Sequence, residues 1–242
     1  MTVRDRLAAG SGLAVLVDPA RTTPEDASLL GERAAGEGVP VLLVGNSFGR
    51  SANTPEIARA LRRAAPDTLL LQFPATAADL VPDVDGVLFL SLVSGRNPQY
   101  LIEEHVRAVP FFDAHPGVAA IATAYCLIDG GSVTAVEAAS PTRPLPANKP
   151  EFVRAHVSAA MRLGMQATYL DAGSGAPQPV SPALVRAGRD AARGPLFVGG
   201  GVRDSTQVRA ARDAGADYVV VGSLFEQSGP RAVGTLVHAA RS

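Results

Sequence analysis

The residues best suited to chemistry lie in the segment TyrLeuAspAlaGlySerGly at residues 169–175. Its acid, Asp171, ends a short apolar run, and the glycines and serine after it provide hydrogen-bond donors on a flexible turn. A carboxylate can act as a general base when it lies within hydrogen-bonding distance of the proton that it removes. We expect Asp171 to be this base and Tyr169 to orient the substrate. The alternative is that Asp171 only caps the loop that follows it.

Two glycine-rich segments indicate a phosphate site. Residues 198–202 read ValGlyGlyGlyVal, and residues 220–225 read ValValGlySerLeuPhe. Backbone N–H groups at the start of a helix can bind a phosphate dianion, and glycines let that anion approach the backbone. Glycines required only by tight turns at strand ends are the alternative, which explains three consecutive glycines poorly. The predicted phosphate contacts are Gly199, Gly200, Gly201, Gly222 and Ser223.

Another acid, Asp18, follows an apolar run and precedes Pro19. Protein-bound Mg²⁺ commonly takes one or two carboxylates and fills its other positions with water and substrate phosphate oxygens. Asp18 is therefore a candidate magnesium ligand, and Ser47 in ValGlyAsnSerPheGly is a candidate second oxygen donor. An N-cap role for Asp18 fits the same residues.

Each of these segments follows a short run of β-branched or leucine residues, and a turn and a stretch with helical spacing come next. The runs are continuously apolar rather than alternating, as is typical of parallel strands that helices cover on both faces. Eight strands are predicted, at residues 13–17, 39–45, 68–73, 86–93, 119–128, 166–171, 195–199 and 218–222.

Helices are predicted in the intervals between most of these strands. Their expected ranges are 24–36, 55–65, 98–114, 150–163, 181–193 and 205–214. Residue types at the ends of these ranges favour Thr54 and Asp204 as N-caps, and Gly36, Gly164 and Gly215 as C′ residues.

Eight parallel strands at intervals of roughly 25 to 35 residues predict an α/β fold, a (β/α)8 TIM barrel. The interval between residues 73 and 86 has room for barely two helical turns, so the helix after the third strand is expected to be reduced or missing. Residues 129–149 are predicted to form a long loop, either a lid or a disordered insertion. Because active sites of such barrels lie at the carboxyl ends of the strands, the acids and glycines above should meet there.

Composition excludes several classes of protein. A chain of 242 residues that is 47% hydrophobic can bury a core as one unit, and residues 1–242 are expected to form a single barrel domain. The single cysteine, Cys126, excludes a disulfide framework, and a net charge of −1 offers no field for nucleic acid or anionic membranes. Without a signal-type segment or a transmembrane run, we expect a cytoplasmic protein.

Taken together, the motifs resemble the geranylgeranylglyceryl phosphate synthase family. They are AspPro after the first strand, GlyAsnSer after the second, PheLeuSerLeuValSerGlyArgAsnPro at 89–98, TyrLeuAspAlaGlySerGly, ValGlyGlyGlyVal and ValValGlySer, and they span nearly the whole chain in order. The resemblance implies a Mg²⁺-dependent barrel prenyltransferase, which takes a prenyl group from its diphosphate and joins it to a hydroxyl of glycerol-1-phosphate.

The resemblance also implies roles for individual residues. Asp18 and Ser47 would hold Mg²⁺ on the diphosphate, and Tyr125 would contact a substrate. Contacts with the phosphorylated acceptor are implied for Tyr169, Leu170, Asp171, Ala172, Gly173, Ser174, Gly175, Gly201, Gly222 and Ser223. Because members of the family are commonly dimers, a homodimer is expected.

Three positions depart from the family pattern. Leu16 stands where the family has a lysine, Asp171 where it has a glutamate, and Thr123 where it often has a glutamate. The loss of the lysine removes a charge-assisted contact with the acceptor. Of the 22 basic residues only Lys149 is a lysine, but a preference for arginine would have left arginine at position 16.

These departures resemble the branch that joins farnesyl diphosphate to 3-phosphoglycerate in moenomycin-type phosphoglycolipid synthesis. We therefore expect a farnesyl or geranylgeranyl donor and favour 3-phosphoglycerate over glycerol-1-phosphate. Arg21 or Arg50 would then bind the acceptor carboxylate. The stretch 87–93 with Tyr100, Phe111 and Phe112 is a candidate groove for the prenyl chain, and ordinary core packing is the alternative.

Two other functions remain open from the residues alone. Asp18 and Asp171 would also suit an isomerase or lyase that acts on a sugar phosphate, since such sites use an acid and a base across the barrel. A barrel that binds a prenyl diphosphate without catalysis is the second alternative, because the lysine is lost and the acid is shortened.

Overall fold

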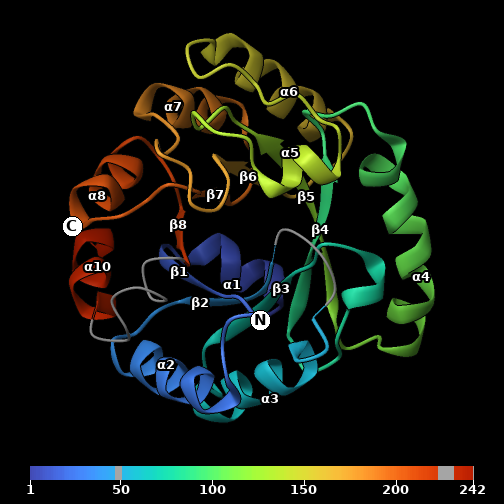
Figure 1. Ribbon diagram of the computed structural model, residues 1–242, viewed down its shortest axis with the longest axis vertical. Helices are drawn as coiled ribbons and strands as arrows, with labels where there is room; N and C mark the ends of the chain where they lie inside the picture. Colours follow the sequence, from blue (N-terminus) through green and yellow to red (C-terminus); the bar gives the residue numbers. More distant parts are fainter. Residues whose placement is uncertain (47–50, 223–231, 242) are drawn as a thin grey trace.

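The computed structural model describes residues 1–46, 51–222 and 232–241, and it contains a closed barrel of eight parallel strands surrounded by helices (Figure 1). The strands are β1 (Gly12–Val17), β2 (Val41–Gly45), β3 (Leu69–Phe73), β4 (Gly86–Leu92), β5 (Ala119–Leu127), β6 (Ala167–Asp171), β7 (Leu196–Gly199) and β8 (Tyr218–Val221). Each strand pairs with the next, and β8 pairs with β1. The predicted (β/α)8 barrel is confirmed.

The helices that follow the strands alternate with them along the chain. They are α2 (Pro24–Gly36), α3 (Thr54–Ala64), α4 (Glu104–Ala114), α6 (Pro150–Arg162), α7 (Pro182–Ala191), α8 (Ser205–Asp213) and α10 (Ala232–Arg241). A π-helical turn, η2 (Gln99–Glu103), leads into α4. Among the helices of the described ranges, none is both long and apolar enough to cross a bilayer.

The helix ends follow local sequence at some positions and not at others. Asp204 caps α8 as predicted, and its side chain accepts a hydrogen bond from Gln207 N. The predictions for Thr54 and Gly36 are wrong. Thr54 is the first residue of α3, and Asn53 occupies the N-cap. The helix α2 includes Gly36, and the left-handed conformation occurs two residues later, at Gly38 (φ 67°).

The unit after β3 lacks a full helix, as predicted. Only one turn, η1 (Ala77–Asp79), lies between β3 and β4. The buried Gln72 amide holds this segment, because it donates to Asp79 O over 2.7 Å and accepts from Val81 N over 3.0 Å. This segment also forms one wall of the apolar pocket described below, through residues 74–77 and Leu80.

Aromatic side chains fill much of the barrel interior. The ring of Tyr169 packs against Phe73, Tyr125 and Phe197, and Phe197 stacks on Tyr218, with ring centroids 4.8–6.1 Å apart. At the amino ends of the strands, α1 (Val3–Ala9) inserts the buried Leu7 into this interior cluster. This end of the barrel is therefore covered.

The segment after β5 is ordered rather than a disordered insertion. It contains the short helix α5 (Ala135–Ala139), and Leu145 forms a bridge with Ile128 next to β5. The Tyr100 hydroxyl donates to Ala139 O over 3.3 Å, and the Asn97 side chain donates to Ser140 O over 3.2 Å. Figure 1 places α5 inside the ring of outer helices, next to β5 and β6.

Candidate active site

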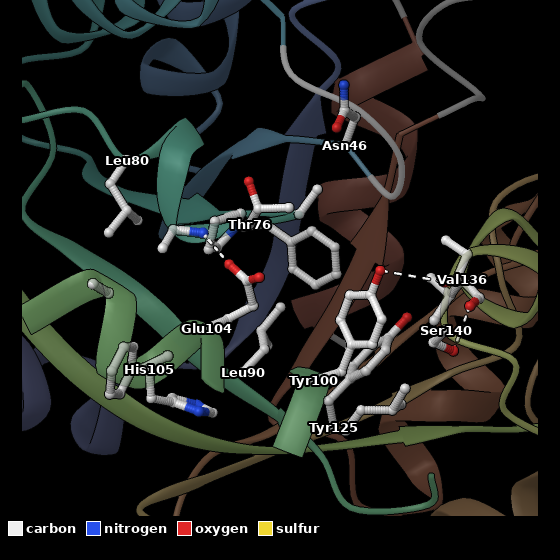
Figure 2. A pocket seen from close by; sticks show the side chains of 18 residues that line it. Asn46, Thr76, Leu80, Leu90, Tyr100, Glu104, His105, Tyr125, Val136 and Ser140 are labelled. Carbon is white, nitrogen blue, oxygen red and sulfur yellow. Dashed lines mark hydrogen bonds between the residues drawn. The ribbon is translucent and has the colours of Figure 1, made fainter. Parts of the chain in front are cut away.

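Two pockets of different character adjoin each other at the carboxyl end of the barrel. The first, called here the polar pocket, has a volume of about 370 Å³ and lies between the ends of β1, β6, β7 and β8. The second, the apolar pocket, has a volume of about 260 Å³ and lies between β3, β4, α4 and α5 (Figure 2). Asn46 and Phe73 line both pockets, so these two residues mark their junction.

The polar pocket brings together residues from distant parts of the sequence. The predicted site residues that line it are Asp18, Arg21, Tyr169, Asp171, Ser174, Gly175, Gly200, Gly201 and Gly222. They meet because the parallel barrel places the carboxyl ends of β1, β6, β7 and β8 at one end of the molecule.

Left-handed glycines shape the loop after β7. Gly200 and Gly201 have φ angles of 81° and 70°, which residues with side chains rarely adopt. A Cβ atom on Gly200 would lie 2.5 Å from Gly173 N and 2.6 Å from Asp171 Oδ1. The β7 loop therefore packs directly on the β6 loop. The Arg203 guanidinium also ties the two loops together, because it donates to Ala176 O over 3.0 Å.

Asp171 sits where the two pockets approach each other, and both of its carboxylate oxygens accept hydrogen bonds. The Tyr125 hydroxyl donates to Oδ2 over 2.6 Å, and Gly173 N donates to Oδ1 over 2.7 Å. Burial raises the pKa of Asp171, while these two hydrogen bonds oppose that rise. The carboxylate is thus held in place by two donors and has a raised pKa, and both properties suit a group that abstracts a proton.

Tyr169 lies beside Asp171 on the inner face of β6 and is nearly fully buried. A Cβ atom on Gly199 would lie 2.5 Å from the Tyr169 hydroxyl oxygen, so that glycine leaves room for the phenol. Burial, and secondarily the charge of Asp171, raise the pKa of Tyr169 well above its usual value. Tyr169 is therefore a neutral phenol that can orient a substrate but cannot act as its base.

Asp18 combines a local role with exposure to the polar pocket. Its Oδ1 accepts from Ala20 N over 2.8 Å, and its Oδ2 lies 3.7 Å from Arg21 Nε. A single carboxylate at the pocket rim fits Mg²⁺, which retains water and substrate oxygens as its other ligands. In the described parts of the chain, no three His, Cys, Asp or Glu side chains gather at one place, so the ion would take most of its ligands from water and substrate.

Leu16 and Thr123, two of the positions that depart from the family pattern, lie in different environments. Leu16 lines the polar pocket and lies against Gly222, where a Cβ atom would be 3.5 Å from Leu16 Cβ. Among the described residues that line this pocket, Arg21 is the only basic one. Thr123 is fully buried, and its hydroxyl donates to Ile121 O over 2.7 Å.

The apolar pocket contains part of the predicted groove. Phe89, Leu90, Leu92 and Tyr100 line it, whereas Phe111 and Phe112 pack against the outer core instead. Figure 2 draws Tyr100 and Tyr125 at its wall, with Leu80, Leu90 and His105 around the remaining space. Leu80, Ala108, Val136 and Ala139 also line this pocket, although their sequence neighbourhoods gave no signal of it.

Some predicted site residues do not line the polar pocket. They lie in the outer core, line the apolar pocket or support other site residues. Leu170 is fully buried outside the barrel against α7, because strand residues alternate and its neighbours Tyr169 and Asp171 point inward. Ala172 lies in the same outer core, and Tyr125 lines the apolar pocket. Gly173 and Gly199 support Asp171 and Tyr169. Ser47, Arg50 and Ser223 lie outside the described residues.

Comparison with known proteins agrees with this geometry. Residues 11–240 match the PcrB family. Geranylgeranylglyceryl phosphate synthase of Zunongwangia profunda is 40% identical over 214 residues, 88% of this chain and 90% of the relative. The protein of the same name from Korarchaeum cryptofilum is 36% identical over 225 residues, with 93% of this chain and 91% of the relative covered.

Solved structures resemble the barrel as well. The crystal structure of (S)-3-O-geranylgeranylglyceryl phosphate synthase from Thermoplasma acidophilum, in complex with its substrate sn-glycerol-1-phosphate, has a TM-score of 0.91 and 27% identity, and the match covers 99% of this chain and 98% of that one. The tryptophan synthase α-subunit of Pyrococcus furiosus, with a TM-score of 0.61, 13% identity and 95% and 96% coverage, shares only the fold.

These relatives confirm the resemblance that the motifs predicted, and they confirm the enzyme class, a prenyltransferase. The match extends over nearly all of the chain and includes the strands that build both pockets. The chain therefore belongs to the PcrB family.

Proposed function

We propose that this enzyme transfers a prenyl group from a prenyl diphosphate to a hydroxyl of a small phosphorylated acceptor, forming an ether. The observation that carries this proposal is the pair of adjoining pockets. An apolar pocket suits the hydrocarbon chain, and the polar pocket suits an anionic acceptor beside a carboxylate. Their junction at Asn46 and Phe73 is where C1 of the prenyl group and the acceptor oxygen would meet.

The acceptor phosphate is assigned to the glycine loops after β7 and β8. Gly200, Gly201 and Gly222 line the polar pocket without side chains, so their backbone is accessible to an anion. The names of the relatives, and the glycerol phosphate in the Thermoplasma acidophilum complex, support an acceptor of this class.

In the proposed reaction, the acceptor oxygen forms a bond to C1 of the prenyl group. The bond between C1 and the diphosphate oxygen breaks, and its electron pair leaves with the diphosphate. The hydroxyl proton moves to the carboxylate of Asp171, while Tyr169 orients the acceptor. The aromatic rings of Phe73 and Tyr169, whose centroids are 5.2 Å apart, both line the polar pocket beside this junction.

We propose Mg²⁺ as the cofactor, with Asp18 as its protein ligand and Ser47 as a second one. When bound, the ion neutralises negative charge on the departing diphosphate. Asp18 suits this role because its carboxylate lies at the rim of the polar pocket.

For the acceptor, we propose 3-phosphoglycerate rather than glycerol-1-phosphate. Leu16 places an apolar side chain next to Gly222, at the position of the family lysine. The guanidinium of Arg21, which lines the same pocket, is a suitable partner for a second anionic group such as a carboxylate. Separately from the acceptor, we propose that the protein forms a homodimer. Light scattering of the purified protein would test this by measuring its molecular mass.

The main test is incubation with farnesyl and geranylgeranyl diphosphates and both acceptors, with and without Mg²⁺, followed by mass spectrometry. We expect ether product only with Mg²⁺. Asp18→Ala should abolish this activity, and Asp171→Ala should lower turnover more than donor binding. Absence of product with every donor would refute the transferase proposal. Donor binding without turnover would instead favour a binding protein, and conversion of a sugar phosphate would favour an isomerase or lyase.

The acceptor preference can be tested at position 16. Leu16→Lys should raise kcat/KM for glycerol-1-phosphate by about 10-fold to 100-fold, since a charge-assisted hydrogen bond contributes about 1.5–3 kcal/mol. Leu16→Met is the matched control, because methionine has similar length and no charge. An equal effect of both substitutions would contradict the role assigned to the missing cation.

A further inference from the structure

We infer that Tyr125 is a positioning residue, which holds the Asp171 carboxylate in the orientation that receives the acceptor proton. This inference deepens the proposed function and rests on it. Sequence motifs and the family resemblance suggest only that Tyr125 contacts a substrate, whereas the structure joins its hydroxyl to the candidate base.

The geometry of this contact is set by two neighbouring strands. Tyr125 on β5 pairs in register with Tyr169 on β6, so its side chain lies one inward position below Asp171. From there the Tyr125 hydroxyl reaches Oδ2 over 2.6 Å, and Gly173 N reaches Oδ1 over 2.7 Å. With one donor on each oxygen, the carboxylate cannot rotate without losing a buried hydrogen bond, which would be unfavourable.

The ring of Tyr125 is itself held in place. Its centroid is 5.9 Å from that of Phe73 and 5.6 Å from that of Tyr169, and both neighbours meet it edge to face. The same ring lines the apolar pocket, as Figure 2 shows. Tyr125 therefore touches the proposed prenyl site with its ring and the proposed base with its hydroxyl.

The hydroxyl has a role that ring packing alone does not require. A phenylalanine would fill the same space among these aromatic rings, but it would leave Oδ2 of a buried carboxylate without this donor. The titratable or charged side chains around Asp171 in the described structure are Tyr125 from β5, Tyr169 from β6, and Asp18 and Arg21 across the polar pocket. Of these, only Tyr125 donates a hydrogen bond to the carboxylate.

This contact also affects the proton affinity of the base. Burial raises the pKa of Asp171, and the hydrogen bond from Tyr125 is the largest effect that lowers it again. Removal of the hydroxyl should therefore raise the pKa further. Because a general base works only when it is ionised, the acidic limb of the activity profile would move to higher pH.

The test is Tyr125→Phe, with kcat and kcat/KM measured against pH. We expect kcat to fall about 10-fold or more while KM for the prenyl donor changes less than about twofold, because the ring remains. The acidic limb of kcat/KM should move to higher pH. Titration of carboxyl-¹³C-labelled aspartate by NMR should show the same upward change in the Asp171 pKa without any turnover.

A second variant changes the donor without removing it. Incorporation of 3-fluorotyrosine at position 125 gives a more acidic hydroxyl of nearly the same size, so it should stabilise the ionised carboxylate more strongly. The Asp171 pKa and the acidic limb should then move to lower pH, opposite to the effect of Tyr125→Phe. This opposite effect also excludes misfolding as the cause.

Tyr218→Phe is the matched control. The Tyr218 hydroxyl is also buried inside the barrel, but it donates to Leu7 O at the other end over 2.9 Å. Its removal should lower the melting temperature without moving the acidic limb. An Asp171 pKa that is the same in wild type and Tyr125→Phe would overturn the inference. Failure of the wild type to form any ether would refute the proposed function, and the NMR titration would still decide whether Tyr125 controls Asp171.

Discussion

At the scale of single residues, Asp171 illustrates a conflict between stability and chemistry. Its side chain is only 5% exposed, and burial disfavours its ionised form, so its pKa in the folded protein is raised. A carboxyl group with a raised folded-state pKa contributes stability below its unfolded-state pKa of about 3.9, and this contribution is lost as pH rises through the folded-state value. At neutral pH the ionised base therefore destabilises the fold.

Asp171→Asn should show this conflict directly. The amide has nearly the same shape and never ionises, and the Tyr125 hydroxyl can accept from it where it formerly donated. We expect the variant to be inactive. Relative to wild type, it should gain stability as pH rises from about 4 to the folded-state pKa of Asp171, and this gain should stay constant at higher pH. Urea unfolding across that pH range measures the difference. A difference in unfolding free energy that is independent of pH would contradict the raised pKa.

The site residues that could be predicted from the sequence are those that belong to a short, contiguous motif. Asp171, Gly200 and Asp18 were each recognisable because they lie at the end of an apolar run or within two residues after it. The hydrogen bond from Tyr125 to Asp171 and the position of Phe73 at the junction could not be predicted in this way. Both depend on the register between neighbouring strands and on which side chains point inward. No short motif contains that information.

At the scale of secondary-structure elements, the loops after β6 and β7 work as one unit. The backbone of Gly200 lies so close to the turn at Gly173 that no side chain fits between them. The orientation of the candidate base and the shape of the phosphate loop are consequently linked. A change in either loop should affect both acceptor binding and turnover.

Gly200→Ala tests this link. The methyl group would meet Gly173 N at 2.5 Å and also require a strained φ of 81°. Gly175→Ala is the control for stability alone, because Gly175 also has a left-handed φ of 72° but has open space around its Cβ position. We expect Gly175→Ala to lose about 1–2 kcal/mol from backbone strain alone.

Gly200→Ala should lose at least about 1 kcal/mol more than the control, and KM for the acceptor should rise. Thermal or urea unfolding and steady-state kinetics measure both effects. If both variants lost the same unfolding free energy, the close contact between the two loops would not contribute to stability, and the proposed link between them would be wrong.

The elements themselves were largely predictable. All eight strands fall within two residues of their predicted ends, because continuous apolar runs bounded by glycine, proline or aspartate have few other interpretations. The sequence did not reveal α1 or α5, since seven-residue and five-residue helices carry too little periodic pattern. The reason for these two helices is evident only in the closed barrel, where α1 covers the amino end and α5 lies at the carboxyl end.

At the scale of the whole molecule, the barrel separates its functional end from an end that serves stability. Both pockets lie at the carboxyl ends of the strands. At the amino ends, α1 closes the interior, and the buried side chain of Leu7 belongs to the same core cluster as Leu43, Leu69 and Leu71. A cavity made at the amino end should therefore weaken folding without altering the chemistry.

Leu7→Ala is the corresponding experiment. Removal of a fully buried leucine side chain typically loses about 2–5 kcal/mol, and Leu7 is 1% exposed. The control is Leu29→Ala on α2, where the side chain is 57% exposed and the change should stay within about 0.5 kcal/mol. At 25 °C, we expect kcat and both KM values of Leu7→Ala to remain within about twofold of wild type. A large fall in kcat with an unchanged unfolding free energy would mean that the amino end contributes to the site, and that the division of the barrel into two ends does not hold for this enzyme.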